Sequence, residues 1–298
     1  MPTVVIGEQS SKGTYASSLT EIPNVTSASL RPDVNIIDEA TIHNRLARVV
    51  HSAGVKASGR VELFASTKAL KLLLSATFLK APTSEQVDTD GDSTNDATKY
   101  TFTPWEVGDT LVYHTIEQIY GSEALKIKDA AVNRLEVRIE ANEIPRMTAE
   151  FVGCMPEKTS PDSYVASTAD VYGFHEATVE VGGSTLTATG ATLTIENGIA
   201  DDYFKLGDKY LADILPGEFT ATVELTLKPT DLTLLLDYLE STSKSVTVTL
   251  QKATNEKLVV TGTAIVTEFE SPIENPAANE TTVTLKFTDI TVELYEPL

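Results

Sequence analysis

A block of residues beginning at Val61 returns at Val223, and this internal repeat restricts the folds open to the chain. Residues 61–74 (VELFASTKALKLLL) align without a gap on residues 223–236 (VELTLKPTDLTLLL), and seven of the fourteen positions are identical. The identical pairs are Val61/Val223, Glu62/Glu224, Leu63/Leu225, Leu70/Leu232, Leu72/Leu234, Leu73/Leu235 and Leu74/Leu236. With 298 residues, the chain has room for two modules of ordinary size. We therefore predict a tandem duplication.

Both copies of the block have the pattern of a strand followed by a helix. Apolar and polar residues alternate over 222–228, as in a half-buried strand, and Pro229 then stops the strand. In the second copy, Thr230 would cap the helix that follows. In the first copy, the cap would be Ser66 or Thr67. The apolar positions at helical spacing are Leu232, Leu235, Leu236 and Leu239 in one copy and Leu70, Leu73 and Leu74 in the other. We expect each helix to be short and to bury this apolar face on a sheet.

The remaining pattern is that of strands and turns. Alternation recurs at 135–140, 147–151, 246–250, 264–269 and 283–287. Gly182-Gly183 predicts a tight hairpin turn, because both central residues of such a turn need positive φ. The predicted fold is mainly β, with two tandem β-sandwich or barrel modules that each carry one short α-helix.

Composition shifts suggest where these modules begin and end. Residues 1–24 are polar and are expected to form an N-terminal arm, 25–157 the first module, 158–171 a linker rich in Pro, Ser and Thr, and 172–298 the second module. Residues 81–100 form a further long polar excursion. Irregular segments this long are usually functional or disordered, and in an assembling protein they are natural contacts between subunits.

The charge of the chain limits its partners. Against 23 Lys and Arg stand 43 Asp and Glu, which gives a formal charge of -20. An acidic surface does not grip phosphate backbones, although it lets DNA slide past; high solubility or a halophilic origin would explain the same charge. We expect no membrane insertion and no general export, because no apolar run approaches about 20 residues and the N-terminus lacks a signal pattern. A single Cys154 excludes an internal disulfide and is expected to be a buried, inert thiol.

Candidate sites for chemistry are few. Carboxylates alternate around Gly91, so an oxygen-ligated Ca²⁺ site is one interpretation and a solvated acidic loop is the other. The candidate metal ligands are Asp88, Asp90, Asp92 and Asp96. The pair Asp201-Asp202 is a lesser candidate. The four histidines show no ligand-like spacing, and they are His43, His51, His114 and His175.

Motifs for catalysis are not found. Neither a Gly-x-Ser-x-Gly elbow nor a Gly-rich phosphate loop with its Lys is present. Glu136, Glu140 and Glu143 are expected on a solvated strand face, and Trp105 is expected to anchor a core or an interface. We predict no catalytic residues, no cofactor and no enzymatic activity, with Ca²⁺ as the one open possibility.

The order of elements resembles the tail tube proteins of long-tailed phages and related viruses. The resembling stretches are residues 13–50, 58–78, 187–225 and 279–294. In the second copy, an acidic DDYFKLG excursion (201–207), a PGEFTATVELTL strand (216–227) and a closing TTVTLKFTDITVEL segment (281–294) follow the order of that family.

The resemblance implies β modules that stack as rings around a hollow lumen through which the viral genome leaves. Single-copy modules of this family form six-membered rings, so a duplicated chain is expected to form homotrimeric, pseudo-hexameric rings; hexameric rings follow instead if one copy is a decoration domain. We expect a net negative lumen lined by Asp and Glu, an arm at 1–24 that bridges to a neighbouring subunit, and no specific DNA binding.

The same resemblance implies partners and a location. The partners are other copies of the chain and the tape measure, terminator, and tip or baseplate proteins of the tail, with assembly in the host cytoplasm and a final place in the virion. Two other readings stay open from the residues alone. One is an adhesive β-sandwich module at a cell surface, and the other is a carboxylate-based hydrolase.

Overall fold

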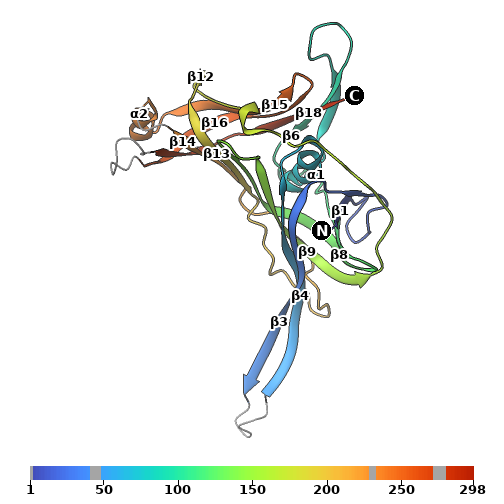
Figure 1. Cartoon of the computed structure of the whole chain (residues 1–298). Coiled ribbons are helices and arrows are strands. Elements are labelled where there is room, and N and C mark those ends of the chain that lie inside the picture. The colour runs from blue at the N-terminus through green and yellow to red at the C-terminus, as the bar shows by residue number, and fades with distance from the viewer. Residues whose placement is uncertain (1–2, 41–47, 228–232, 271–279) are drawn as a thin grey trace.

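The computed structural model describes residues 3–40, 48–227, 233–270 and 280–298 (Figure 1). The chain is mainly β, as predicted, with two α-helices and one 3-10 turn, η1 (Phe174–Glu176), in this part. Neither helix has the length and apolar character needed to span a membrane. The predicted module boundaries at 24/25 and 171/172 fall between elements, whereas the boundary at 157/158 falls inside the strand β9 (Arg146–Thr159). All described strands belong to one continuous hydrogen-bonded network, so the division into modules stays a prediction.

Six strands of the N-terminal half form what we name the first strand set. They are hydrogen-bonded in the order β3-β4-β9-β8-β7-β1, and every neighbouring pair is antiparallel. Their bounds are β1 (Thr3–Glu8), β3 (Val25–Ala40), β4 (Arg48–Phe64), β7 (His114–Tyr120), β8 (Glu123–Glu140) and β9 (Arg146–Thr159). Helix α1 (Thr67–Phe78) follows β4, and the short strands β2 (Leu19–Glu21) and β10 (Tyr164–Val165) extend the β1 edge.

Six strands of the C-terminal half form the second strand set, which has the same order of pairing. The order is β13-β14-β17-β16-β15-β11, again antiparallel throughout. The bounds are β11 (Ala177–Val181), β13 (Ala188–Glu196), β14 (Thr220–Leu227), β15 (Ser243–Ala253), β16 (Glu256–Glu270) and β17 (Thr281–Phe287). Helix α2 (Thr233–Glu240) follows β14, as α1 follows β4. The predicted Gly182-Gly183 turn is confirmed between β11 and β12 (Ser184–Thr185), with φ of 61° and 78°.

One strand contact joins the two sets. The second half of β8 pairs with β13, with Val137 opposite Leu193 and Leu135 opposite Ile195. This contact creates a continuous run of eight antiparallel strands, β3-β4-β9-β8-β13-β14-β17-β16, which we call the front sheet. The first halves of β8 and β16 bend away to pair with β7 and β15, so a second layer covers each end of the front sheet.

Apolar side chains of the front sheet point into the core between the layers. Helix α1 lies in this core, and Leu70, Leu73 and Leu74 are at most 1% exposed, as predicted from their spacing. Ser66 occupies the N-cap position of α1, although its side chain makes no capping hydrogen bond. Cys154 is buried as expected, and burial raises the pKa of its thiol to about 12, so the thiol stays protonated and unreactive.

The N-terminal segment differs from the prediction of an extended polar arm. Residues 3–8 form β1, which pairs with β7, and Val4, Val5 and Ile6 are at most 2% exposed. The prediction was wrong here because three adjacent apolar residues fill a strand that is covered on both faces, so they show no alternation against the polar residues around them.

Two hairpins project from the body in opposite directions (Figure 1). The first, which we call the arm, consists of the outer parts of β3 and β4, and β9 pairs with β4 only from Ala57 onward. The second consists of β5 (Thr83–Val87) and β6 (Ala97–Phe102) and includes the polar excursion of residues 81–100. It is anchored where β6 pairs with β18 (Thr291–Pro297), which in turn pairs with β16.

The connection between β13 and β14 supports the base of the arm. Residues 197–219 take the place that the arm has in the first set, but they fold back against β4. Val55 N–H donates to Lys209 O at 2.7 Å, and Leu211 N–H donates to Val55 O at 3.0 Å. Asp201 forms an ion pair with Lys56, so this carboxylate of the Asp201-Asp202 pair has a structural role. The corresponding connections of the two sets are thus an extended hairpin and a compact loop.

Candidate assembly surfaces

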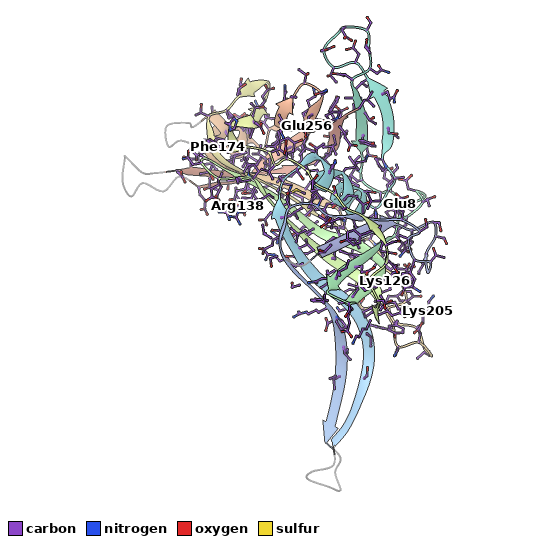
Figure 2. The ribbon with its side chains drawn as sticks, turned by 45° about the vertical axis from the view of Figure 1, so that its right-hand side comes forward. Glu8, Lys126, Arg138, Phe174, Lys205 and Glu256 are labelled. Carbon is purple, nitrogen blue, oxygen red and sulfur yellow. The ribbon has the colours of Figure 1, made fainter. Side chains whose placement is uncertain are left out.

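The outward face of the front sheet is a polar, hollowed surface. A groove of about 550 Å³ runs over β8, β13, β14 and β17. Arg138 lies on this side of the body (Figure 2). Most of the groove is lined by six threonines, four glutamates and two arginines, so its lining has an excess of two negative charges. The residues are Thr192, Thr194, Thr220, Thr222, Thr226, Thr284, Glu136, Glu140, Glu196, Glu224, Arg134 and Arg138.

The charges of this face are paired along and across strands. Arg134 lies 3.1 Å from Glu136 and 3.5 Å from Glu196, and Arg138 pairs with Glu140. Glu136 and Glu140 therefore lie on a polar strand face, as predicted, and each is in an ion pair, whereas Glu143 is exposed in the turn after β8. Exposed pairs of this kind add little stability, so their main effect is to neutralise the surface locally.

The front sheet ends in two edges that no other described strand covers. One is the side of β3 that faces away from β4, and the other is the second half of β16, residues 266–270. When the two strand sets are aligned by their order of pairing, β3 corresponds to β13 and β16 corresponds to β8. The contact between β8 and β13 is made within the chain. Phe269 is half-buried, whereas its counterpart Val137 is 3% exposed, because Val137 has the neighbour that Phe269 lacks.

Helix α2 exposes an apolar face, contrary to the expectation that this face would be buried. Leu236 and Leu239 are 65% and 67% exposed, whereas Leu74, the counterpart of Leu236, is 1% exposed. The prediction was wrong because α1 is covered by β16 of the second strand set and by β18, which pairs with β16. Among the described elements, α2 makes substantial contact with β16 of its own set alone. Leu232 lies outside the described residues.

The acidic loop of the β5–β6 hairpin is held by its own backbone. Asp88 accepts hydrogen bonds from Gly91 N–H and Ser93 N–H, both at 2.7 Å, and these bonds hold the pKa of its carboxyl below the ordinary value. Oxygens of Asp88, Asp90 and Asp92 lie within 4.8 Å of one another. Asp96 instead accepts two hydrogen bonds from Thr89. The structure therefore brings three of the four predicted carboxylates together, and Ca²⁺ binding there stays a prediction.

Replacing Asp88 is expected to loosen this loop without unfolding the protein. In Asp88→Ala the amides of Gly91 and Ser93 lose their acceptor, so their hydrogen exchange should become faster while the melting temperature stays the same. Asp92→Ala is the matched control, because Asp92 accepts only the Thr94 N–H bond. Unchanged exchange at Gly91 in Asp88→Ala would contradict this account, and slower exchange of the wild-type loop in added Ca²⁺ would reveal an ion site.

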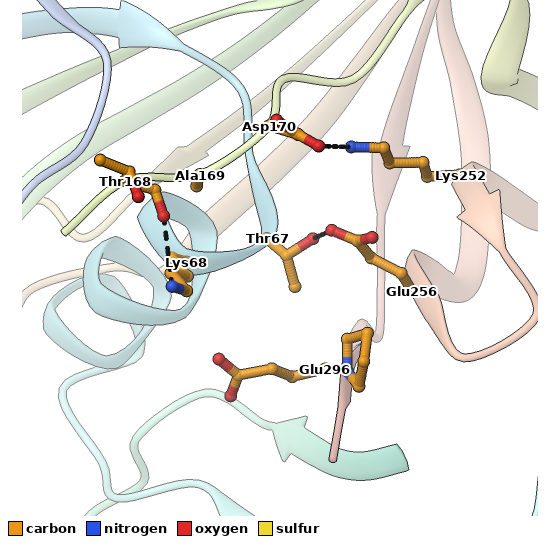
Figure 3. A pocket seen from close by; sticks show the side chains of 9 residues that line it. Thr67, Lys68, Thr168, Ala169, Asp170, Lys252, Glu256 and Glu296 are labelled. Carbon is orange, nitrogen blue, oxygen red and sulfur yellow. Dashed lines mark hydrogen bonds and ion pairs between the residues drawn. The ribbon is translucent and has the colours of Figure 1, made fainter. Parts of the chain in front are cut away.

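A second depression lies where the N-terminus of α1 meets the second strand set (Figure 3). Thr67 Oγ1 donates to Glu256 at 2.8 Å, Lys252 lies 3.2 Å from Asp170, and Lys68 Nζ donates to the Thr168 carbonyl at 3.2 Å. The three contacts tie residues 168–170 and the β15–β16 turn to α1. These polar groups are thus partnered with one another where α1, residues 168–170 and the second strand set meet.

The other predicted positions have ordinary structural environments. His114 is buried and burial lowers its pKa to about 4, so it is neutral at pH 7. His175 is exposed, and the side chains of His43 and His51 lie outside the described ones. Trp105 packs at the edge of a small cluster and donates from Nε1 to the Asp109 carbonyl at 3.1 Å, which fits the expected anchoring role. Among described residues, only the acidic loop groups three potential metal ligands.

The similarity of this chain to known proteins lies at the level of a family. A search of curated proteins gave no significant match. The family described as phage tail tube protein matches residues 3–293, which is nearly the whole chain. Proteins of this family are structural components of the virion tail. The chain therefore belongs to the phage tail tube protein family.

Proposed function

We propose that three copies of this chain form one closed ring of the tail tube, and that the chain is a tandem duplication of one tube module. The support for the duplication is the identical strand order of the two sets, each with a helix after its repeated strand. Three chains would supply the six modules of a pseudo-hexameric ring. The alternative is a hexameric ring in which one strand set lies outside as a decoration.

The contact between β8 and β13 is the observation that carries the ring. Repeating it between chains would place β3 of one subunit against the second half of β16 of the next. By the register of the internal contact, Ala28 would face Phe269 and Leu30 would face Val266, with a bulge at Thr267. The two uncovered edges of the front sheet would then be paired, and a head-to-tail contact of this kind closes into a ring.

The polar face of the front sheet would line the lumen of such a ring. Its excess of glutamate over arginine favours a net negative wall, and its threonines add neutral hydroxyls. Such a wall repels the phosphates of DNA at long range and offers no cluster of free cations to hold them. We propose that DNA passes through without specific binding. A lumen that is net positive in an assembled tube would contradict this.

The arm and the β5–β6 hairpin would make contacts along the tube axis, because they project from opposite sides of the body. Exposed Val34 and Ile36, at 42% and 60%, give the arm an apolar surface for this purpose. The expected contact of residues 1–24 with a neighbouring subunit would rest on residues 10–14 and 17–18, which are exposed, since β1 is in the core. Tape measure, terminator, and tip or baseplate proteins would meet the ends of the tube, and assembly would take place in the host cytoplasm.

Electron microscopy of the purified protein tests this proposal. Class averages viewed along the particle axis are expected to show hollow rings or tubes with three chains and six similar lobes per ring. Six chains per ring would favour the decoration alternative. A protein that stays monomeric at all concentrations, even when mixed with its tail initiator proteins, would contradict assembly into a tube.

A further inference from the structure

We infer that Gln118 of β7 is an internal cap on the β3 edge, which it releases when β16 of a second copy of the chain pairs there. The inference rests on the proposed ring contact, and it adds a residue that restrains this contact before assembly. Gln118 is 2% exposed and lies between the two layers of the first strand set.

The side chain of Gln118 makes two hydrogen bonds to β3. Leu30 N–H donates to Gln118 Oε1 at 2.8 Å, and Gln118 Nε2 donates to the Ala28 carbonyl at 3.2 Å. In an antiparallel ladder, the groups of alternate residues point to the same side of the strand. The primary amide thus satisfies the donor and the acceptor that a strand beside β3 would otherwise use.

The second strand set shows which residue replaces Gln118 when the corresponding edge is paired with another strand. There β13 corresponds to β3, and its Leu193 and Ile195, the counterparts of Ala28 and Leu30, face Val137 and Leu135 of β8. The counterpart of Gln118 is Leu250, because Leu250 faces Leu258 on β16 as Gln118 faces Leu125 on β8. Leu250 is 1% exposed. The amide is therefore found in the set whose edge lacks a strand, and a leucine stands in its place in the set whose edge is paired.

The comparison indicates a function for a buried amide in an otherwise apolar position. A free strand edge invites indiscriminate pairing, and proteins commonly block such edges. The two hydrogen bonds between Gln118 and β3 block the β3 edge at Ala28 and Leu30 in the monomer. On ring closure, backbone groups of residues 266–269 take over both hydrogen bonds to β3. The side-chain amide of Gln118 then loses its two partners, and this loss raises the concentration needed for assembly.

Gln118→Leu, which copies the second strand set, tests the cap. In the monomer, the Leu30 amide is expected to exchange at least tenfold faster than in the wild type. In the assembled state, Leu30 exchange should be slow in both proteins, because β16 of the neighbour now accepts this hydrogen bond. The critical concentration for assembly should fall on the order of tenfold. Gln118→Met, whose side chain has a similar length but no amide, should behave like Gln118→Leu.

Controls separate the cap from general effects. Gln86→Leu adds the same apolar side chain on exposed β5 and should leave Leu30 exchange and the critical concentration unchanged. Unchanged Leu30 exchange in the Gln118→Leu monomer would overturn the cap. Faster exchange with an unchanged critical concentration would overturn its role in assembly. If the wild type formed no rings, the proposed function would fail, while the exchange of Leu30 in the monomer would still test the cap.

Discussion

The double substitution Leu236→Glu and Leu239→Glu is expected to abolish ring formation and to leave the monomer folded. Both side chains are about two-thirds exposed in the monomer, so the free energy of unfolding should change by less than about 0.5 kcal/mol. In the proposed ring, the first strand set of the next subunit would cover α2 as the second set covers α1. Burying two unpaired carboxylates there would cost about 4 kcal/mol or more, which weakens the contact about a thousandfold.

Leu74→Glu is the matched control, because Leu74 aligns with Leu236 and is already covered within the chain. Burial of an unpaired charge in the core is expected to destabilise the monomer by about 4 kcal/mol. Thermal unfolding and sedimentation velocity distinguish the two results: a stable monomer that forms no rings in one case, and a protein of low melting temperature in the other. Normal rings from the Leu236→Glu, Leu239→Glu protein would show that α2 faces solvent in the tube.

Shortening the arm is expected to give rings that do not stack into tubes. Residues 36–53 can be replaced by an Asn-Gly turn between Asn35 and Gly54, which oppose each other on β3 and β4. The shortened hairpin keeps Val55 and its hydrogen bonds to residues 209 and 211, so the support from the loop at 197–219 is unchanged. Electron microscopy should show single rings of unchanged symmetry.

A smaller change within the arm serves as the comparison. Val34→Asp alone keeps the full length of the arm and changes its exposed apolar surface, so it should weaken stacking less than the shortened arm does. Tubes of normal length from the shortened protein would show that the arm makes no contact between rings. Loss of single rings would assign the arm to the ring itself.

Local patterns could be predicted from the sequence because each depends on neighbours in the chain. The alternation at 222–228, the helical spacing around Leu70 and the positive φ required at Gly182 and Gly183 are all local properties. The structure confirms the alternation over 222–227, the helix around Leu70 and the positive φ of both glycines. The acidic loop was found for the same reason, since Asp88, Asp90 and Asp92 are close in sequence.

Features that depend on distant parts of the chain could not be predicted. Leu74 and Leu236 occupy the same place in the repeated block, yet Leu74 is buried and Leu236 is exposed. The reason is that, within the chain, only Leu74 lies next to the other strand set. Val4 to Ile6 gave no alternating signal, since β1 is covered on both faces. Gln118 looks like any polar residue of a strand, and only the register of β7 and β8 reveals that its counterpart is Leu250.

The unequal connections of the two strand sets also bear on how successive rings can be oriented. The first set extends its connection as an arm, and the second folds the equivalent connection back against β4. The proposed ring of three chains would have six similar walls but only three arms. Two such rings would then engage fully at rotations that differ by 120° and not at the intermediate ones. In the proposed tube, the angular phase between neighbouring rings would thereby be fixed, so a twist at one end of the tail would be transmitted along it without slippage between equivalent positions.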